Sequence, residues 1–194
     1  MKYFVLLLIP IVINGCQAQI ENHLKKDEKE IVVKIIDKLS YVQPPPPPNT
    51  NDAIYGISDT MVDSIGRMKL KVAIYPIMGN EMEKSSIDKI PNEYQDLLKP
   101  EMEILHLENV KGLESKKGHT IMLADTQQLK KSMEFKNFDL LYNFSRIRFD
   151  ENYTKAIFEV GVSRSRLAGN ASIFCLKKVE GNWNIEHVIP TSEW

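Results

Sequence analysis

The amino-acid sequence predicts an α+β fold, and three observations support this prediction. Four β-rich runs separated by short polar breaks occupy the last third of the chain, a pattern typical of antiparallel hairpins. Residues 21–40 carry apolar side chains at helical spacing. Hydrophobic residues make up 43% of the 194 residues, which supports a packed core. We therefore expect an N-terminal tether helix and a polyproline linker, then a domain that ends in a four-stranded antiparallel meander.

The first fifteen residues have the composition of a secretory signal peptide. Lys2 provides a positive start, and residues 3–13 form a continuous apolar run. This run is too short to span a bilayer as a helix, which requires about 20 apolar residues. We therefore expect residues 1–15 to be removed on export.

The residues around the expected cleavage point resemble the lipobox of bacterial lipoproteins. Ile13 stands three positions before Cys16, and the small residue Gly15 comes directly before it, with Asn14 as an unusual occupant of the position between. The resemblance implies cleavage before Cys16 and a lipid on its sulfur, with fatty acyl chains such as palmitate. It places the protein in the bacterial cell envelope, anchored to the outer membrane.

Residues 16–49 are expected to form the tether, and residues 50–194 the globular domain. The tether helix has one apolar face, formed by Leu24, Ile31, Val32, Ile35, Ile36 and Leu39. This face packs either on the domain or on a partner, and mixed charge on the other face disfavours a membrane surface. The five prolines at 44–48 favour a polyproline II rod, acting as a spacer or strap or docking into an aromatic groove of a partner.

Shorter elements are predicted in the middle of the chain. Residues 68–78 alternate enough for a strand, and Pro76 places the end of that strand at a sheet edge. Asp125 and Gln128 have the spacing of a capping box, so a helix should start there and run to about residue 134. One or two helical turns are expected at 92–98, and short strands at 102–107 and 120–123.

The predicted meander is built from the runs 141–149, 153–163, 171–179 and 183–189. In the second run, alternation places one set of apolar residues on a single face: Ala156, Phe158, Val160 and Val162. In the fourth run, Trp183, Ile185 and Ile189 are expected to share a face, with His187 in the same register. The third run is apolar on both faces, which predicts a central position in the sheet.

The last third also resembles a group of uncharacterised secreted and lipoprotein-type bacterial proteins. The matching positions are Ser145, Arg146, Phe149, Asp150, Lys155, Ala156, Gly169, Leu176, Lys177, Gly181 and Trp183. They belong mostly to hairpins and core packing and cover about 50 of the 194 residues. The resemblance supports the fold and is nearly silent on function.

The residue types required for common active sites do not form a recognisable pattern. With Cys16 lipidated, Cys175 has no disulfide partner, and its apolar surroundings predict a buried, inert thiol. The four histidines, His23, His106, His119 and His187, lack the spacing of metal ligands. We therefore expect no metal and no cofactor.

Two groups of residues remain as candidate sites. The first group consists of four arginines, Arg146, Arg148, Arg164 and Arg166. If the sheet brings their side chains together, they would bind a carboxylate or phosphate. Otherwise they pair at the surface with Asp150, Glu151 or Glu159. Thr60 and Ser64 each follow an aspartate and precede an aliphatic residue, which is similar to the O-glycosylation acceptor of exported proteins in one group of Gram-negative bacteria. These hydroxyls are expected in an exposed loop, either unmodified or glycosylated.

These observations favour a monomeric, membrane-anchored, non-enzymatic binding or assembly module with an envelope protein as its partner. The near-neutral formal charge of −1 provides no electrostatic reason to expect nucleic acid. The alternative is a small hydrolase or ligand-binding roll that uses the concave face of the sheet, with Arg146, His187 or Glu159. Convergent polar groups with perturbed pKa values would favour the alternative, and a filled apolar core the binding module.

Overall fold

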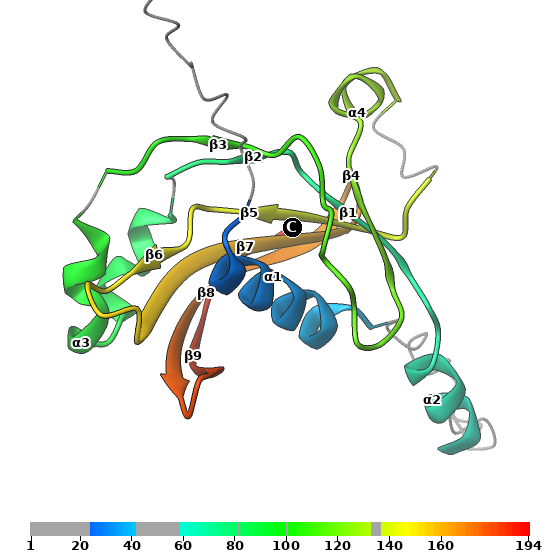
Figure 1. Ribbon diagram of the computed structural model, residues 1–194. Helices are drawn as coiled ribbons and strands as arrows, with labels where there is room; N and C mark the ends of the chain where they lie inside the picture. The colour runs from blue at the N-terminus through cyan, green and yellow to red at the C-terminus, as the bar shows by residue number, and fades with distance from the viewer. Residues whose placement is uncertain (1–23, 42–58, 81, 100, 133–136) are drawn as a thin grey trace, which may run out of the picture.

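The computed structural model describes residues 24–41, 59–80, 82–99, 101–132 and 137–194. Its main sheet has the strand order β4-β1-β5-β7-β8-β9, with β6 also paired to β7 (Figure 1). The α+β class and the C-terminal antiparallel series are confirmed. Cys16 and the five prolines at 44–48 lie outside the described residues. None of the described helices is long and apolar enough to cross a bilayer.

The C-terminal strands form the larger part of the sheet. They are β5 (Leu140–Phe144), β6 (Arg148–Phe149), β7 (Lys155–Ser165), β8 (Ala168–Val179) and β9 (Asn182–Glu193). The first predicted run is thus two strands, β5 and β6, which both pair antiparallel with β7. As predicted, β8 is central, between β7 and β9.

The N-terminal strands extend the sheet with parallel pairing, which the sequence pattern did not predict. β1 (Lys71–Ile74) pairs parallel with both β4 (Thr120–Leu123) and β5, so it is an interior strand. Pro76 follows β1 and precedes β2 (Ile77–Met78), so it interrupts no ladder. β2 and β3 (Leu105–His106) form a separate two-stranded antiparallel sheet.

Helix α1 (Lys26–Leu39) packs its apolar face on one face of the main sheet, as the first alternative predicted. Ile31, Val32, Ile35 and Ile36 are fully buried there among side chains that include Phe158. The predicted inward-facing residues of β7 all belong to this core. The Ser40 hydroxyl, just after α1, hydrogen-bonds the Tyr142 hydroxyl of β5 at 2.9 Å.

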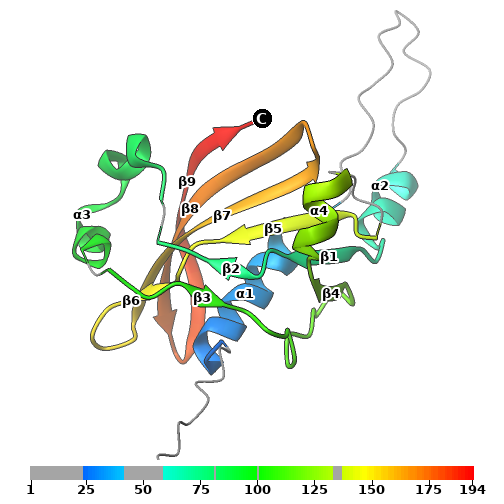
Figure 2. The ribbon, with the colours of Figure 1, turned by 90° about the horizontal axis from the view of Figure 1, so that it is seen from above.

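The opposite face of the sheet is only partly covered. Three short helices lie on this face: η1 (Lys84–Lys89), α3 (Asn92–Gln95) and η2 (Asp96–Leu98). Ile90, which directly follows η1, and Tyr94 and Leu97 belong to a smaller core. These residues pack on the sheet residues Ile157, Ile173, Cys175 and Ile189. Figures 1 and 2 show β2 and β3 on the side of the sheet away from α1.

A bulge in β9 overturns the expectation that Trp183, Ile185 and Ile189 share a face. Cys175 pairs with His187, whereas the next residue of β8, Leu176, pairs with Ile185, so the register shifts by one. Trp183 and Ile185 therefore pack on the α1 side, while Ile189 packs in the smaller core. One extra residue reverses the direction of the side chains that follow it, up to a second register shift after Pro190. Alternation alone cannot reveal such a reversal.

The remaining helices lie outside the sheet. The Asp125 carboxylate accepts hydrogen bonds from the backbone N–H groups of Gln127 and Gln128 at 2.9 and 3.1 Å, and α4 (Thr126–Ser132) begins there, as predicted. α2 (Asp59–Gly66) contains Thr60 and Ser64, so both hydroxyl residues lie in a helix and not in a loop. Ser64 is exposed. Their glycosylation stays a prediction.

Candidate functional site

A groove of about 1180 Å³ lies on the sheet face opposite α1. Its floor is formed by side chains of β5, β7 and β8, and one wall by Tyr75 and Ile77. We call this hollow the sheet groove, and its lining also includes Asn80, Met82, Glu83, Lys84, Ile104, Asn143, Glu159, Gly161, Ser163, Ala171 and Trp194. The volume exceeds the 300–1,000 Å³ typical of sites for small ligands, and apolar surface mixed with a few polar groups is typical of binding sites.

Glu159 is the acidic group on the floor of the sheet groove, and both of its oxygens are occupied. Oε2 accepts a hydrogen bond from the backbone N–H of Glu83 at 2.8 Å. Oε1 accepts a hydrogen bond from the Thr191 hydroxyl at 2.6 Å. Glu159 therefore ties strand β7 to the groove wall and to β9, which is a structural role.

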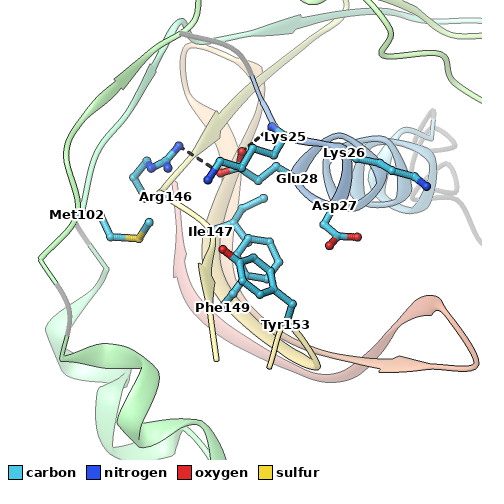
Figure 3. Close-up of a pocket in the computed structure, with 9 residues that line it drawn as sticks. All are labelled: Lys25, Lys26, Asp27, Glu28, Met102, Arg146, Ile147, Phe149 and Tyr153. Atoms are coloured by element: carbon cyan, nitrogen blue, oxygen red, sulfur yellow. Dashed lines mark hydrogen bonds and ion pairs between the residues drawn. The ribbon is translucent and has the colours of Figure 1, made fainter. Parts of the chain in front are cut away.

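A second, smaller pocket of about 270 Å³ lies at the start of α1 (Figure 3). Arg146 Nη1 and Glu28 Oε1 form an ion pair at 3.3 Å, with side chains 14% and 5% exposed. Glu28 Oε2 also accepts a hydrogen bond from the backbone N–H of Lys25 at 2.8 Å. On the other side of the pocket, Phe149 stacks on Tyr153 with ring centres 5.1 Å apart. Glu28 is thus the counter-ion of Arg146, and these two charges of the pocket are paired within the protein.

The four arginines are not gathered around one hollow. Arg146 pairs with Glu28, whereas Arg148 is buried and donates from Nη2 to the carbonyl oxygen of Asn80 at 2.9 Å. Burial lowers the pKa of Arg148. The guanidinium of Arg164 lies 4.9 Å from the ring centre of Tyr41, which follows the C-terminal end of α1, whereas Glu28 lies in the first turn of that helix. Arg166 is exposed in the turn after β7. Backbone spacing along β5 to β7 could not predict that Arg146, Arg148 and Arg164 would contact three different parts of the molecule.

The bulge in β9 also creates a cluster that the sequence analysis missed. Glu93, Glu186 and His187 are all exposed, and their donor atoms lie within 4.8 Å of one another. Glu93 pairs with Lys155 at 3.0 Å. Glu186 accepts a hydrogen bond from the Tyr94 hydroxyl at 2.6 Å and lies 3.6 Å from Lys177 Nζ. These groups could hold a divalent cation only by giving up the lysines.

Two of the buried polar or reactive side chains, Cys175 and His119, are unsuited to catalysis. Cys175 is fully buried, as predicted, and burial raises the pKa of its thiol to about 12. The thiol is therefore protonated at neutral pH and cannot serve as a nucleophile. His119 Nδ1 accepts a hydrogen bond from the backbone N–H of Leu70 at 3.1 Å, and burial lowers its pKa. His119 is a neutral structural histidine that fixes the entry into β1.

Comparison with known proteins identifies no relative, because no family model, no curated protein and no solved structure matches the chain. The α+β architecture by itself does not define an activity. The function is therefore inferred from the sheet groove and from the chemistry of the residues that line it.

Proposed function

We propose that this protein is a lipid-anchored, non-enzymatic binding module of the bacterial cell envelope, and that the sheet groove is its binding site. The observation that supports this proposal is the groove itself, an open hollow of mixed lining on a sheet whose other face is filled by α1. A filled core on one face and an open groove of mixed lining on the other leave the groove as the face available to a ligand.

The distribution of polar groups favours binding over hydrolysis. Arg146 lies in the pocket at the start of α1, Glu159 on the groove floor, and His187 beside Tyr94, outside the groove lining. General acid–base catalysis requires such groups within hydrogen-bond reach of one substrate. These three residues are in three places, and Glu159 already has two hydrogen-bond donors.

Site-directed photo-crosslinking in the native envelope tests the groove as the binding site. A benzophenone amino acid at Lys84, on the exposed rim of the groove, should produce a specific covalent adduct. The same group at Asn184, exposed on β9 away from the groove, is the matched control and should produce none. Equal adducts from both positions, or none from Lys84, would contradict the proposal.

The anchor is tested through Cys16. We expect the Cys16→Ser variant to lose membrane association, because the lipobox resemblance implies several acyl chains on this sulfur, and two or more chains hold a protein stably at a membrane. Detergent partitioning and the intact mass of the mature protein are the measurements. A mature protein that begins at another residue, or carries no acyl mass, would show that there is no lipid anchor.

A further inference from the structure

We propose that Trp194, Asn143 and Ser163 form a saccharide subsite within the sheet groove, which takes an uncharged sugar ring. The inference rests on the proposed function, since it names the ligand class of the same groove. It is built from the position of one indole ring and from the neutral polar side chains beside it.

Two glycines make room for the indole of Trp194 on the sheet. A Cβ atom on Gly169 would lie 2.6 Å from Trp194 Cε2, and one on Gly161 would lie 3.6 Å from Trp194 Cη2. The ring therefore covers the place where a side chain of Gly169 would stand, and reaches across to β7. The backbone holds it there, since the N–H groups of Gly169 and Trp194 donate to each other's carbonyl oxygens at 2.8 and 3.1 Å.

The other side of this ring remains available to a ligand. Trp194 is 48% exposed although it packs on the sheet, and it lines the sheet groove. Aromatic side chains that combine a flat apolar surface with a polar N–H are common in the lining of ligand-binding hollows. An exposed indole of this kind presents a flat apolar surface to the groove.

Hydrogen-bonding groups flank the indole on the same face of the sheet. Asn143 is opposite Gly161 in the ladder, and Ser163 is opposite Gly169. Both side chains line the groove, and neither has a hydrogen-bond partner within the described part of the chain. An amide and a hydroxyl together supply donors and acceptors that can bind the hydroxyl groups of a ligand.

The polar side chains beside the indole favour an uncharged ligand. Asn143 and Ser163 are neutral, and the carboxylate of Glu159 on β7 already accepts hydrogen bonds from Glu83 and Thr191. The other charged residues that line the groove, Glu83 and Lys84, come from the segment at its rim and not from the strands beside the indole. A pyranose ring combines an apolar C–H face, which stacks on an aromatic ring, with equatorial hydroxyls at its rim. A pyranose therefore matches a neutral amide, a hydroxyl and an indole that lie side by side.

Trp194 also provides the means to test the proposal in the full-length protein. The chain has two tryptophans, and Trp183 is fully buried, so collisional quenching by iodide reports mainly on Trp194. Chitotriose, maltotriose and cellotriose are the probes. At least one of them should protect Trp194 from iodide and shift its emission to shorter wavelength. If none protects Trp194 at concentrations up to 10 mM, the saccharide subsite is wrong.

Variants then assign the binding to these residues, with affinity measured by calorimetry. Trp194→Ala should weaken binding about tenfold or more, and Asn143→Ala by a smaller factor. Gly169→Ala should also weaken binding several-fold, because the new methyl group displaces the indole without removing it. Gly66→Ala is its matched control, since a Cβ there meets nothing within 4 Å, and it should bind as the wild type does.

Two outcomes separate this inference from the proposed function. If Trp194→Ala and Gly169→Ala keep full affinity while melting normally, the sugar binds elsewhere and the inference is overturned. If the Lys84 crosslinker captures only a polypeptide and no saccharide protects Trp194, the groove is a binding site, as proposed, but its ligand is not a glycan.

Discussion

Replacing Trp183 with alanine is expected to lower the free energy of unfolding by about 3–5 kcal/mol, as for other fully buried tryptophans. Trp183 is fully buried in the core beneath α1, and its ring centre lies 5.5 Å from that of Phe149. Its indole N–H also donates to Asp27 Oδ1 at 3.2 Å. Lys178 donates to the same oxygen at 2.8 Å, and this bond, with that of the indole, lowers the pKa of Asp27. The substitution thus removes both a core side chain and a link between β9 and α1.

Urea denaturation followed by circular dichroism is the appropriate measurement, because it does not depend on tryptophan emission. Trp194→Ala is the matched control, since it removes the same side chain from a half-exposed position, and it should cost much less. Trp183→Phe should lie between the wild type and Trp183→Ala. An unchanged midpoint for Trp183→Ala would mean that β9 does not have the register described.

Removing the charge of Glu28 is the second substitution with a large expected effect. Glu28→Gln should cost on the order of 3 kcal/mol, because it leaves the guanidinium of Arg146 buried without its counter-ion. The loss comes from an unpaired buried charge and not from lost packing, since glutamine has nearly the shape of glutamate. Glutamine also keeps an oxygen that can accept the hydrogen bond from Lys25.

A double-mutant cycle with Arg146→Met identifies this mechanism. The double variant should recover most of the stability, because neither charge is then buried. Asp63→Asn is the matched control, since its ion pair with Arg67 has side chains 73% and 81% exposed, and it should leave the unfolding midpoint unchanged. If Glu28→Gln and Arg146→Met add their effects without recovery, the two groups are not coupled.

Local chemistry explains the elements that were predicted correctly. Three features were predicted from residues that are close together in the sequence. They are the apolar face of residues 31–36, the alternation in β7 and the capping aspartate before α4. Such patterns can be recognised in the sequence, because buried residues recur about every 3.6 residues in a helix and about every two residues in a strand. They were sufficient for the α+β class and for the order of the C-terminal hairpins.

The candidate site could be predicted only in part, for a different reason. The four arginines were predicted either to form one anion site or to pair at the surface with Asp150, Glu151 or Glu159. The structure instead pairs Arg146 with Glu28, a residue 118 positions earlier in the chain. The carboxylates proposed as surface partners, such as Glu159, have other donors. Pairing across such separations depends on how α1 crosses the sheet, and no local pattern records that.

By itself, the sequence determined the fold class, the apolar faces of α1 and β7, the central place of β8 and the burial of Cys175. Each follows from the local period of hydrophobic residues. Only the tertiary structure decided that β1 runs parallel between β4 and β5. It also decided that one extra residue in β9 turns His187 and Ile189 to the face opposite Trp183. The position of Trp194 over two glycines in an open groove is a third feature of this kind. These features depend on contacts between segments that are distant in the sequence. A single inserted residue changes the face of the sheet to which the following side chains point, and the local hydrophobic pattern does not show this change.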